Sequence, residues 1–183
     1  MSYYNSKLPI EVSLEYPLYQ SEKGNYFIAQ TPIITSETSK SIVVLKNPIN
    51  SNKKIYLNAI TITNISSSSL SSEFYLRSNF NDGLTSKLVS CTNTTIFPKP
   101  IPEGKIKYLG NANMPPINGV SIFSRIVSPY STLVIDGGQI ILAPGEAIAV
   151  YIGGFLSTSF DGIIIAFGWW EEDFHYNNDM CKY

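Results

Sequence analysis

Charged side chains are scarce in this chain. Of its 183 residues, 13 are Lys or Arg and 14 are Asp or Glu, which gives a formal net charge of −1. The charged fraction is 15%, whereas an average soluble domain carries about 25%. This balance excludes a nucleic-acid binder that relies on net positive charge. The hydrophobic fraction of 44% is too high for a disordered chain, so we expect one folded domain.

Histidine and cysteine are rarer still, with one His and two Cys in the chain. Most zinc sites and His-based catalytic sites need more of these residues, so we expect no catalytic residues, no metal and no cofactor. Two cysteines do not make a disulfide framework. Cys91 and Cys181 are either ordinary thiols or a cross-link, within one chain or between subunits, because Cys181 lies close to the C-terminus.

Long apolar runs are also missing. The longest, at 140–142 and 163–167, have the length of strands and fall far short of the roughly 18 residues that cross a bilayer as a helix. The opening residues, MSYYN, do not combine a basic region with an apolar one, so we recognise no secretory signal. We expect no membrane span.

The sequence does contain strand-like alternation, punctuated by Gly, Pro, Asn and Asp. We predict a hairpin that joins two strands through a run of serines, with a loose loop of serines as the alternative, and a tight turn at 136–138. The pattern predicts an all-β fold, an antiparallel jelly-roll sandwich. Strands are expected at 26–30, 41–45, 55–64, 72–77, 87–91, 120–126, 132–136, 139–142, 146–152 and 163–171, with the hairpin between 55–64 and 72–77.

Two segments fall outside this regular pattern. Residues 79–128 contain five prolines that exclude a continuous central strand, and we interpret them as an ordered excursion. Residues 1–25 form an extended N-terminal arm. We therefore expect an arm at 1–25, one jelly-roll domain at 26–171 and a C-terminal tail at 172–183.

The arm contains a clear alternation of apolar and polar residues. Ile10, Val12, Leu14 and Tyr16 fall on one side of a predicted strand, and the residues between them are polar. Such a segment can add a strand to an exposed sheet edge. Our hypothesis is that it reaches an adjacent subunit, and the alternative is a first strand that pairs within its own domain.

Several predicted strands are apolar on both faces. In 146–152, Ile148 and Val150 lie on one side while Ala149 and Tyr151 lie on the other. An antiparallel sheet with one wet face should instead alternate between apolar and polar residues. The second face must be only weakly polar, or be covered by the Pro-rich excursion, by the N-terminal segment or by another copy of the chain.

The remaining candidate residues are polar or aromatic. His175 is a lone histidine among acidic and aromatic neighbours, and we interpret it as a contact in the tail. The acidic run 171–173 is interpreted as a solvated exit from the last strand. The candidate surface aromatics are Tyr108, Tyr130 and Trp170, which either stack on a sugar or pack in a core or interface.

Four segments carry a family resemblance. Residues 41–48 (SIVVLKNP) and 54–64 (KIYLNAITITN) resemble the opening of small jelly-roll structural proteins of bacteria and phages. Residues 135–146 (IDGGQIILAPGE) and a closing strand that ends in WWE at 169–171 fit the same pattern. These proteins include subunits of spore or surface appendage fibres and components of virions or tails.

The resemblance implies a non-enzymatic structural subunit whose partners are copies of itself. It would assemble through its strand faces and its N-terminal arm into an extracellular filament or appendage, or into a virion-type particle. Its place would be a cell or spore surface, or a virion. The alternative is a carbohydrate- or receptor-binding jelly-roll module, whose partner is a glycan or a surface receptor.

Overall fold

Strands dominate the computed structural model, which describes residues 13–156 and 160–174. They form two six-stranded sheets, here called sheet A and sheet B. Sheet A has the order β10 (Ser131–Leu142), β4 (Lys53–Asn64), β12 (Phe160–Asp173), β1 (Tyr26–Gln30) and β7 (Val89–Cys91), and β2 (Ile34–Ser36) also pairs with β12. Sheet B has the order β6 (Leu84–Thr85), β8 (Lys105–Leu109), β3 (Ser41–Lys46), β11 (Ala147–Ile152), β5 (Leu70–Leu76) and β9 (Val120–Val127).

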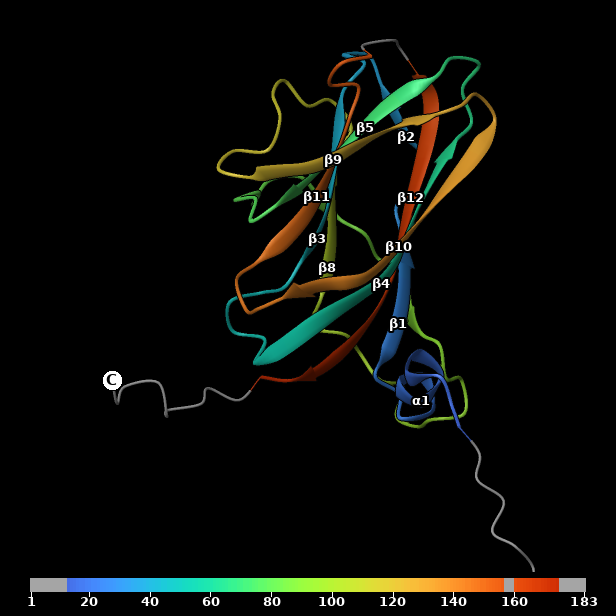
Figure 1. Ribbon diagram of the computed structural model, residues 1–183, viewed down its shortest axis with the longest axis vertical. Helices are drawn as coiled ribbons and strands as arrows, with labels where there is room; N and C mark the ends of the chain where they lie inside the picture. The colour runs from blue at the N-terminus through green and yellow to red at the C-terminus, as the bar shows by residue number, and fades with distance from the viewer. Residues whose placement is uncertain (1–12, 157–159, 175–183) are drawn as a thin grey trace, which may run out of the picture.

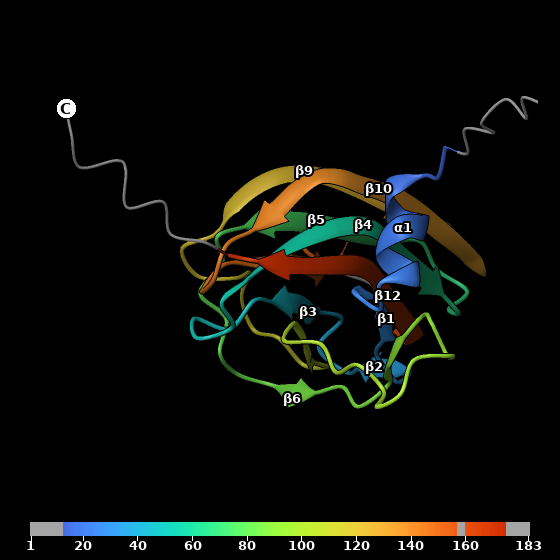
Figure 2. The same ribbon diagram turned by 90° about the horizontal axis from the view of Figure 1, so that it is seen from below.

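The two sheets pack face to face, and every strand pairing among the described residues is antiparallel. Figure 1 shows the sandwich with its longest axis vertical, and Figure 2 shows it from below, with β10, β4, β12 and β1 following one another on one side. The expected all-β antiparallel sandwich is confirmed.

The core between the sheets comes from one face of each strand. In β12 the inward face is the one that contains Ile163, Ile165, Phe167 and Trp169, which are all buried in the core. Strands β3, β5 and β11 contribute the facing side chains from sheet B, such as Phe74. Alternation therefore separates the inner face of the long strands from the outer one.

The predicted hairpin between 55–64 and 72–77 is wrong, because β4 belongs to sheet A and β5 to sheet B. The chain leaves sheet A at Asn64, whose side chain is fully buried. Its Nδ2 donates to the carbonyl oxygens of Ser68 (2.8 Å) and Ser128 (3.1 Å), and its Oδ1 accepts from the Ser66 N–H (2.9 Å). These bonds hold a corner in which the serine run crosses between the sheets.

The predicted turn at 136–138 is also wrong. Residues 131–142 form the single strand β10, and both halves of it pair with β4. The register shifts between Asp136, which lies opposite Ala59, and Ile140, which lies opposite Leu57. The glycines thus form a β-bulge within one strand instead of a turn between two.

The excursion 79–128 is ordered, as expected, and it extends both sheets. Its strands are β6, β7, β8 and β9, of which β6 and β8 were not predicted. The prolines lie between these strands, at 98–102 and at 115–116. Part of the excursion also covers the outer face of sheet B, where Phe80, Leu109 and Ala112 pack with Ala149 and Tyr151 in a second buried cluster.

The N-terminal segment contains a helix that was not predicted. The predicted strand 10–16 overlaps the described residues only at 13–16, where residues 13–15 have no regular structure and Tyr16 begins α1 (Tyr16–Glu22). Pro17 occupies the start of α1, where its missing N–H is harmless. Figure 1 shows α1 at the foot of β1. Among the described residues, no helix is long and apolar enough to cross a membrane.

Candidate functional site

The most distinctive surface of the molecule lies where β9 and β10 run along the same side of the sandwich. Each is an edge strand, β9 of sheet B and β10 of sheet A. A short connection at 128–130 joins them, and the buried Asn64 side chain anchors it through the carbonyl oxygen of Ser128. We call this surface, formed by residues 120–142, the β9–β10 side.

Exposed apolar side chains gather on the β9–β10 side. Val134 is 61% exposed and Ile126 is 58% exposed. Side chains that point between the sheets here, including Phe123, Leu133 and Ile135, are only partly buried against the core. Exposed apolar side chains on two neighbouring edge strands are consistent with an interaction site. Its exposed apolar residues are Val120, Ile122, Ile126, Tyr130, Val134 and Ile141.

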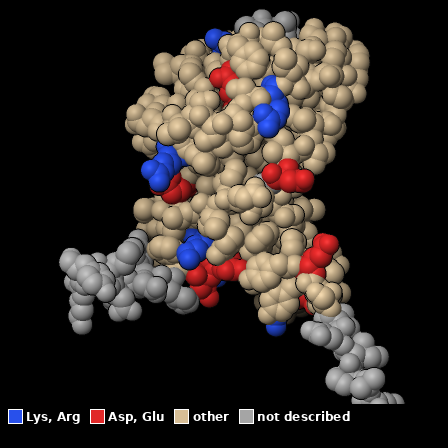
Figure 3. Space-filling view, viewed as in Figure 1, with Lys and Arg blue, Asp and Glu red and all other residues tan. Residues whose placement is uncertain are grey.

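Charge is almost missing from the β9–β10 side. Between Lys107 and Glu146 the sequence carries two charged residues, Arg125 and Asp136, of opposite sign. The Arg125 guanidinium lies over the ring of Phe123, 4.9 Å from its centroid. Figure 3 views the molecule from the direction of Figure 1, in which β9 and β10 lie at the front, and shows only scattered charged side chains.

Natural sheets usually protect their edges with lysines, prolines or bulges. Strand β9 and the first half of β10 contain neither Lys nor Pro. The bulge of β10 follows Asp136, so residues 131–136 keep a regular register with β4 and an unpaired outer edge. The β9–β10 side therefore combines apolar side chains with free backbone hydrogen-bonding groups.

The three candidate surface aromatics lie on separate elements. Tyr130 is 74% exposed in the β9–β10 connection, and Tyr108 on β8 packs against the core. Trp170 on β12 is only 7% exposed. Its ring stacks on Tyr56, with centroids 5.2 Å apart, and on Tyr26, with centroids 6.4 Å apart. Both faces of the Trp170 ring are thus occupied by protein, which leaves neither face for a sugar.

Only part of the N-terminal arm can be placed. Ile10 and Val12 lie outside the described residues, and Leu14 is 44% exposed. Tyr16 packs on its own chain, because its ring lies 5.8 Å from Trp170 and its hydroxyl donates to Glu172 (2.6 Å). This hydrogen bond is the main reason why the pKa of Tyr16 is raised, with burial second. The segment from Tyr16 onward is therefore bound within the subunit.

Of the two cysteines, the structure describes Cys91. Cys91 is a free, buried thiol on β7 whose Sγ lies 3.6 Å from the carbonyl oxygen of Gly24. A cross-link at Cys91 would first require this part of the core to open. Cys181 and His175 lie outside the described residues. Among the residues that the structure describes, there is no group of three or more His, Cys, Asp or Glu side chains that could hold a metal ion.

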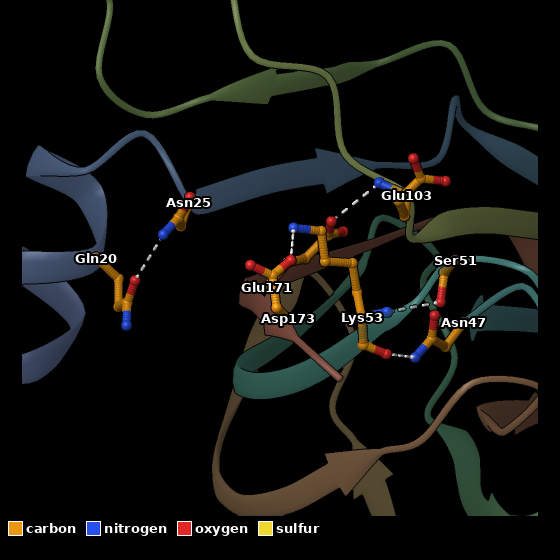
Figure 4. Close-up of polar contacts among 8 residues, drawn as sticks. All are labelled: Gln20, Asn25, Asn47, Ser51, Lys53, Glu103, Glu171 and Asp173. Atoms are coloured by element: carbon orange, nitrogen blue, oxygen red, sulfur yellow. Dashed lines mark hydrogen bonds and ion pairs between the residues drawn. The ribbon is translucent and has the colours of Figure 1, made fainter. Parts of the chain in front are cut away.

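The interpretation of 171–173 as a solvated exit is wrong for Glu171, which is 5% exposed. Its Oε1 accepts from the Gly104 N–H (2.8 Å) and from Nε1 of Trp169 (2.9 Å), and its Oε2 accepts from the Glu103 N–H (3.0 Å). A side chain at Gly104 would collide with this carboxylate and with Ile55. Figure 4 shows Glu171 pointing at the Glu103 backbone.

Glu171 thus ties the proline-containing loop to the last strand. The signal for this was present in the sequence, because Glu171 has the same parity in β12 as the inward residues 163–169. Its neighbours behave differently: Glu172 accepts from Nε2 of Gln20 (2.8 Å) as well as from Tyr16, and Asp173 pairs with Lys53 (2.6 Å).

A further polar cluster lies on the outer face of sheet B. The Tyr75 hydroxyl donates to Oε2 of Glu73 at 2.9 Å. Burial, with this hydrogen bond second, raises the pKa of Tyr75 to about 12. Burial also raises the pKa of Tyr151, with the nearby Glu73 charge adding to it. At neutral pH both phenols therefore stay protonated. The Tyr75 hydroxyl donates to Glu73, whereas the buried Tyr151 hydroxyl has no hydrogen-bond partner among the described residues.

Comparison with known proteins gives one match. No curated protein and no solved structure matches this chain. A family model described as "Family of unknown function (DUF6143)" matches residues 2–176, which include all of both sheets, the β9–β10 side and α1. The chain belongs to this family of unknown function, DUF6143.

Proposed function

We propose that this protein is a non-enzymatic structural subunit that assembles with copies of itself into a filament or a particle at a cell or spore surface or in a virion. The observation that carries the proposal is the β9–β10 side, in which two edge strands without Lys or Pro present exposed aliphatic side chains and almost no charge. Apolar contact and strand pairing are both available there, and like charges would do little to keep two copies apart.

The contrast with sheet B supports this proposal. The excursion covers part of the outer face of sheet B, where Phe80 and Ala112 pack with Ala149 and Tyr151. It leaves Val134 and Ile126 uncovered on the β9–β10 side. An exposed apolar surface that a chain does not cover itself is typical of an interface.

We also propose that the sandwich is a jelly roll. Its eight main strands in chain order are β1, β3, β4, β5, β9, β10, β11 and β12. The first pairs with the last, the second with the seventh, the third with the sixth and the fourth with the fifth. This nested pairing is what a long antiparallel hairpin produces when it rolls up, and it supports the assignment. Strands β2, β6, β7 and β8 are additions to that plan.

The test is the effect of a charge placed on the β9–β10 side. We expect the wild-type protein to self-associate in size-exclusion chromatography with light scattering, and to give regular assemblies by negative-stain microscopy. Val134→Lys should weaken self-association at least about tenfold, because a lysine cannot be buried unpaired at the interface. Leu84→Lys is the matched control, since Leu84 is 66% exposed on β6 at the opposite edge of sheet B. A wild type that stays monomeric at high concentration would refute the proposal.

A binding module is the second candidate, and one observation favours it. A shallow hollow of about 300 Å³ lies beside β1 and β7, lined by Ile28, Leu88, Val89 and Ala166 with Gln30 and Ser90 as polar groups. Its size is at the lower limit for small-molecule sites. In isothermal titration calorimetry with oligosaccharides, a saturable heat of binding would favour this candidate. If no such heat is measured, assembly remains as the proposed function.

A further inference from the structure

We propose that residues 10–14 of one copy pair as an added strand with the free edge of β10, at residues 131–136, in a second copy. This inference deepens the proposed function and rests on it, because it names the element that joins the copies. The free edge of β10 would accept the strand, residues 10–14 would donate it, and the direction of the chain favours a donor from another molecule.

The acceptor is the first half of β10. Residues 131–136 pair with β4 in unbroken register on one side and have no strand on the other. Leu133 and Ile135 point toward the core but are only partly buried. A strand added at this edge would bond to its free N–H and C=O groups and complete the cover over Leu133 and Ile135.

The donor is the apolar alternation at Ile10, Val12 and Leu14. Polar Glu11 and Ser13 fall between them, so an added strand would turn its apolar side inward and its polar side to water. Leu14 is 44% exposed, and Ser13 and Leu14 precede Glu15, the N-cap of α1, so the subunit leaves much of this end of the segment uncovered. Twelve residues precede Ser13, enough to span about 40 Å when extended.

The direction of the chain favours a second copy over the same one. Tyr16 fixes the end of the segment against Trp170, which lies opposite Tyr56, and Tyr56 lies opposite Ile141 near the end of β10. The described end of the segment, at Tyr16, therefore lies at the end of the molecule at which β10 also finishes. Laid along its own β10 it would be parallel, in a sandwich whose described pairings are all antiparallel, and parallel pairs are the less stable. A second copy can offer β10 in the antiparallel direction.

The first test is cross-linking between separately prepared chains. One chain carries Ser13→Cys and the other Val134→Cys, both with Cys181→Ser, while the buried Cys91 is kept. A short bismaleimide linker should join them into a covalent heterodimer, and Leu84→Cys in place of Val134→Cys is the control that should not react in this way. If a single chain carrying both new cysteines cross-links within the monomer instead, the segment folds back and the inference is overturned.

The second test breaks the apolar face of the segment. Ile10→Asn with Val12→Asn should weaken self-association about tenfold, whereas Glu11→Asp with Ser13→Asn, on the polar face, should leave it unchanged. Assembly that survives the first pair of substitutions would overturn this inference and leave the proposed function standing. A monomeric wild type would instead remove the proposed function itself.

Discussion

At the scale of single residues, Glu171 shows how this weakly charged chain uses a buried carboxylate. Removing a carboxylate from water is costly unless hydrogen bonds replace the lost hydration. Glu171 receives three, from the N–H groups of Glu103 and Gly104 and from the indole of Trp169. Two of the donors lie in the loop before β8 and the third, Trp169, lies on β12 beside Glu171, so the carboxylate fastens this loop to the end of β12.

We therefore predict that Glu171→Gln lowers the free energy of unfolding by about 2 kcal/mol, the usual value for hydrogen bonds to a charged group. The glutamine amide keeps the size of the side chain but turns one acceptor into a donor that faces another donor. Urea unfolding followed by Trp fluorescence measures the change.

The control for this prediction is Glu103→Gln, because the side chain of Glu103 is exposed and its backbone N–H is unaffected. If Glu171→Gln and Glu103→Gln are both as stable as the wild type, the Glu171 carboxylate contributes little to holding the loop before β8 against β12.

At the scale of elements, local alternation predicts the long strands well because each buries one face. Alternation separates the two faces of β12 and of β5, and the faces that contain Trp169 and Phe74 are the buried ones. Which sheet a strand joins is a different matter, since it depends on contacts distant in sequence. The corner after β4 is held by the Asn64 side chain and the Ser128 carbonyl oxygen, 64 residues apart, and no local pattern marks that bond.

The same limit explains the errors at β10 and α1. Asp136 followed by two glycines is equally compatible with a turn and a bulge, and only the continuous pairing with β4 decides between them. In α1, alternation up to Tyr16 suggested a strand, although Pro17 is a good first residue of a helix. The β9–β10 side could not be located from the sequence, because its exposure depends on which strands end up at the edges.

The corner at Asn64 gives a prediction of its own. Asn64→Ala should lower the free energy of unfolding by about 3 kcal/mol, because it leaves the buried Ser66 N–H and the part-buried carbonyl oxygens of Ser68 and Ser128 without their partner. Chemical unfolding would measure the loss. Asn113→Ala is the matched control, since that side chain is exposed. If the free energy of unfolding falls no more than in the control, water replaces the hydrogen bonds of the Asn64 amide almost fully.

At the scale of the whole molecule, different segments of the chain cover the outer faces of the two sheets, and the β9–β10 side has no such cover. The excursion covers part of sheet B, and α1 covers the Trp170 end of sheet A through Tyr16. The β9–β10 side is left with Val134 and Ile126 in contact with water. Other apolar side chains are exposed too, such as Phe97 and Ile101, but the β9–β10 side adds the free edges of two strands. Strand edges on one side give a subunit a preferred direction of association, which is what a filament or a particle needs.

The chemistry of that side predicts how assembly should respond to solution conditions. Arg125 and Asp136 are its two charges, so raising the concentration of sodium chloride should not dissociate the assemblies, whereas a contact held by ion pairs would weaken with screening. Because apolar burial strengthens on warming from the cold and in the presence of sulfate, light scattering should increase from ice temperature to room temperature and again on adding ammonium sulfate. Val134→Lys should flatten both responses while Leu84→Lys keeps them. Dissociation by sodium chloride alone would show instead that charged residues elsewhere hold the copies together.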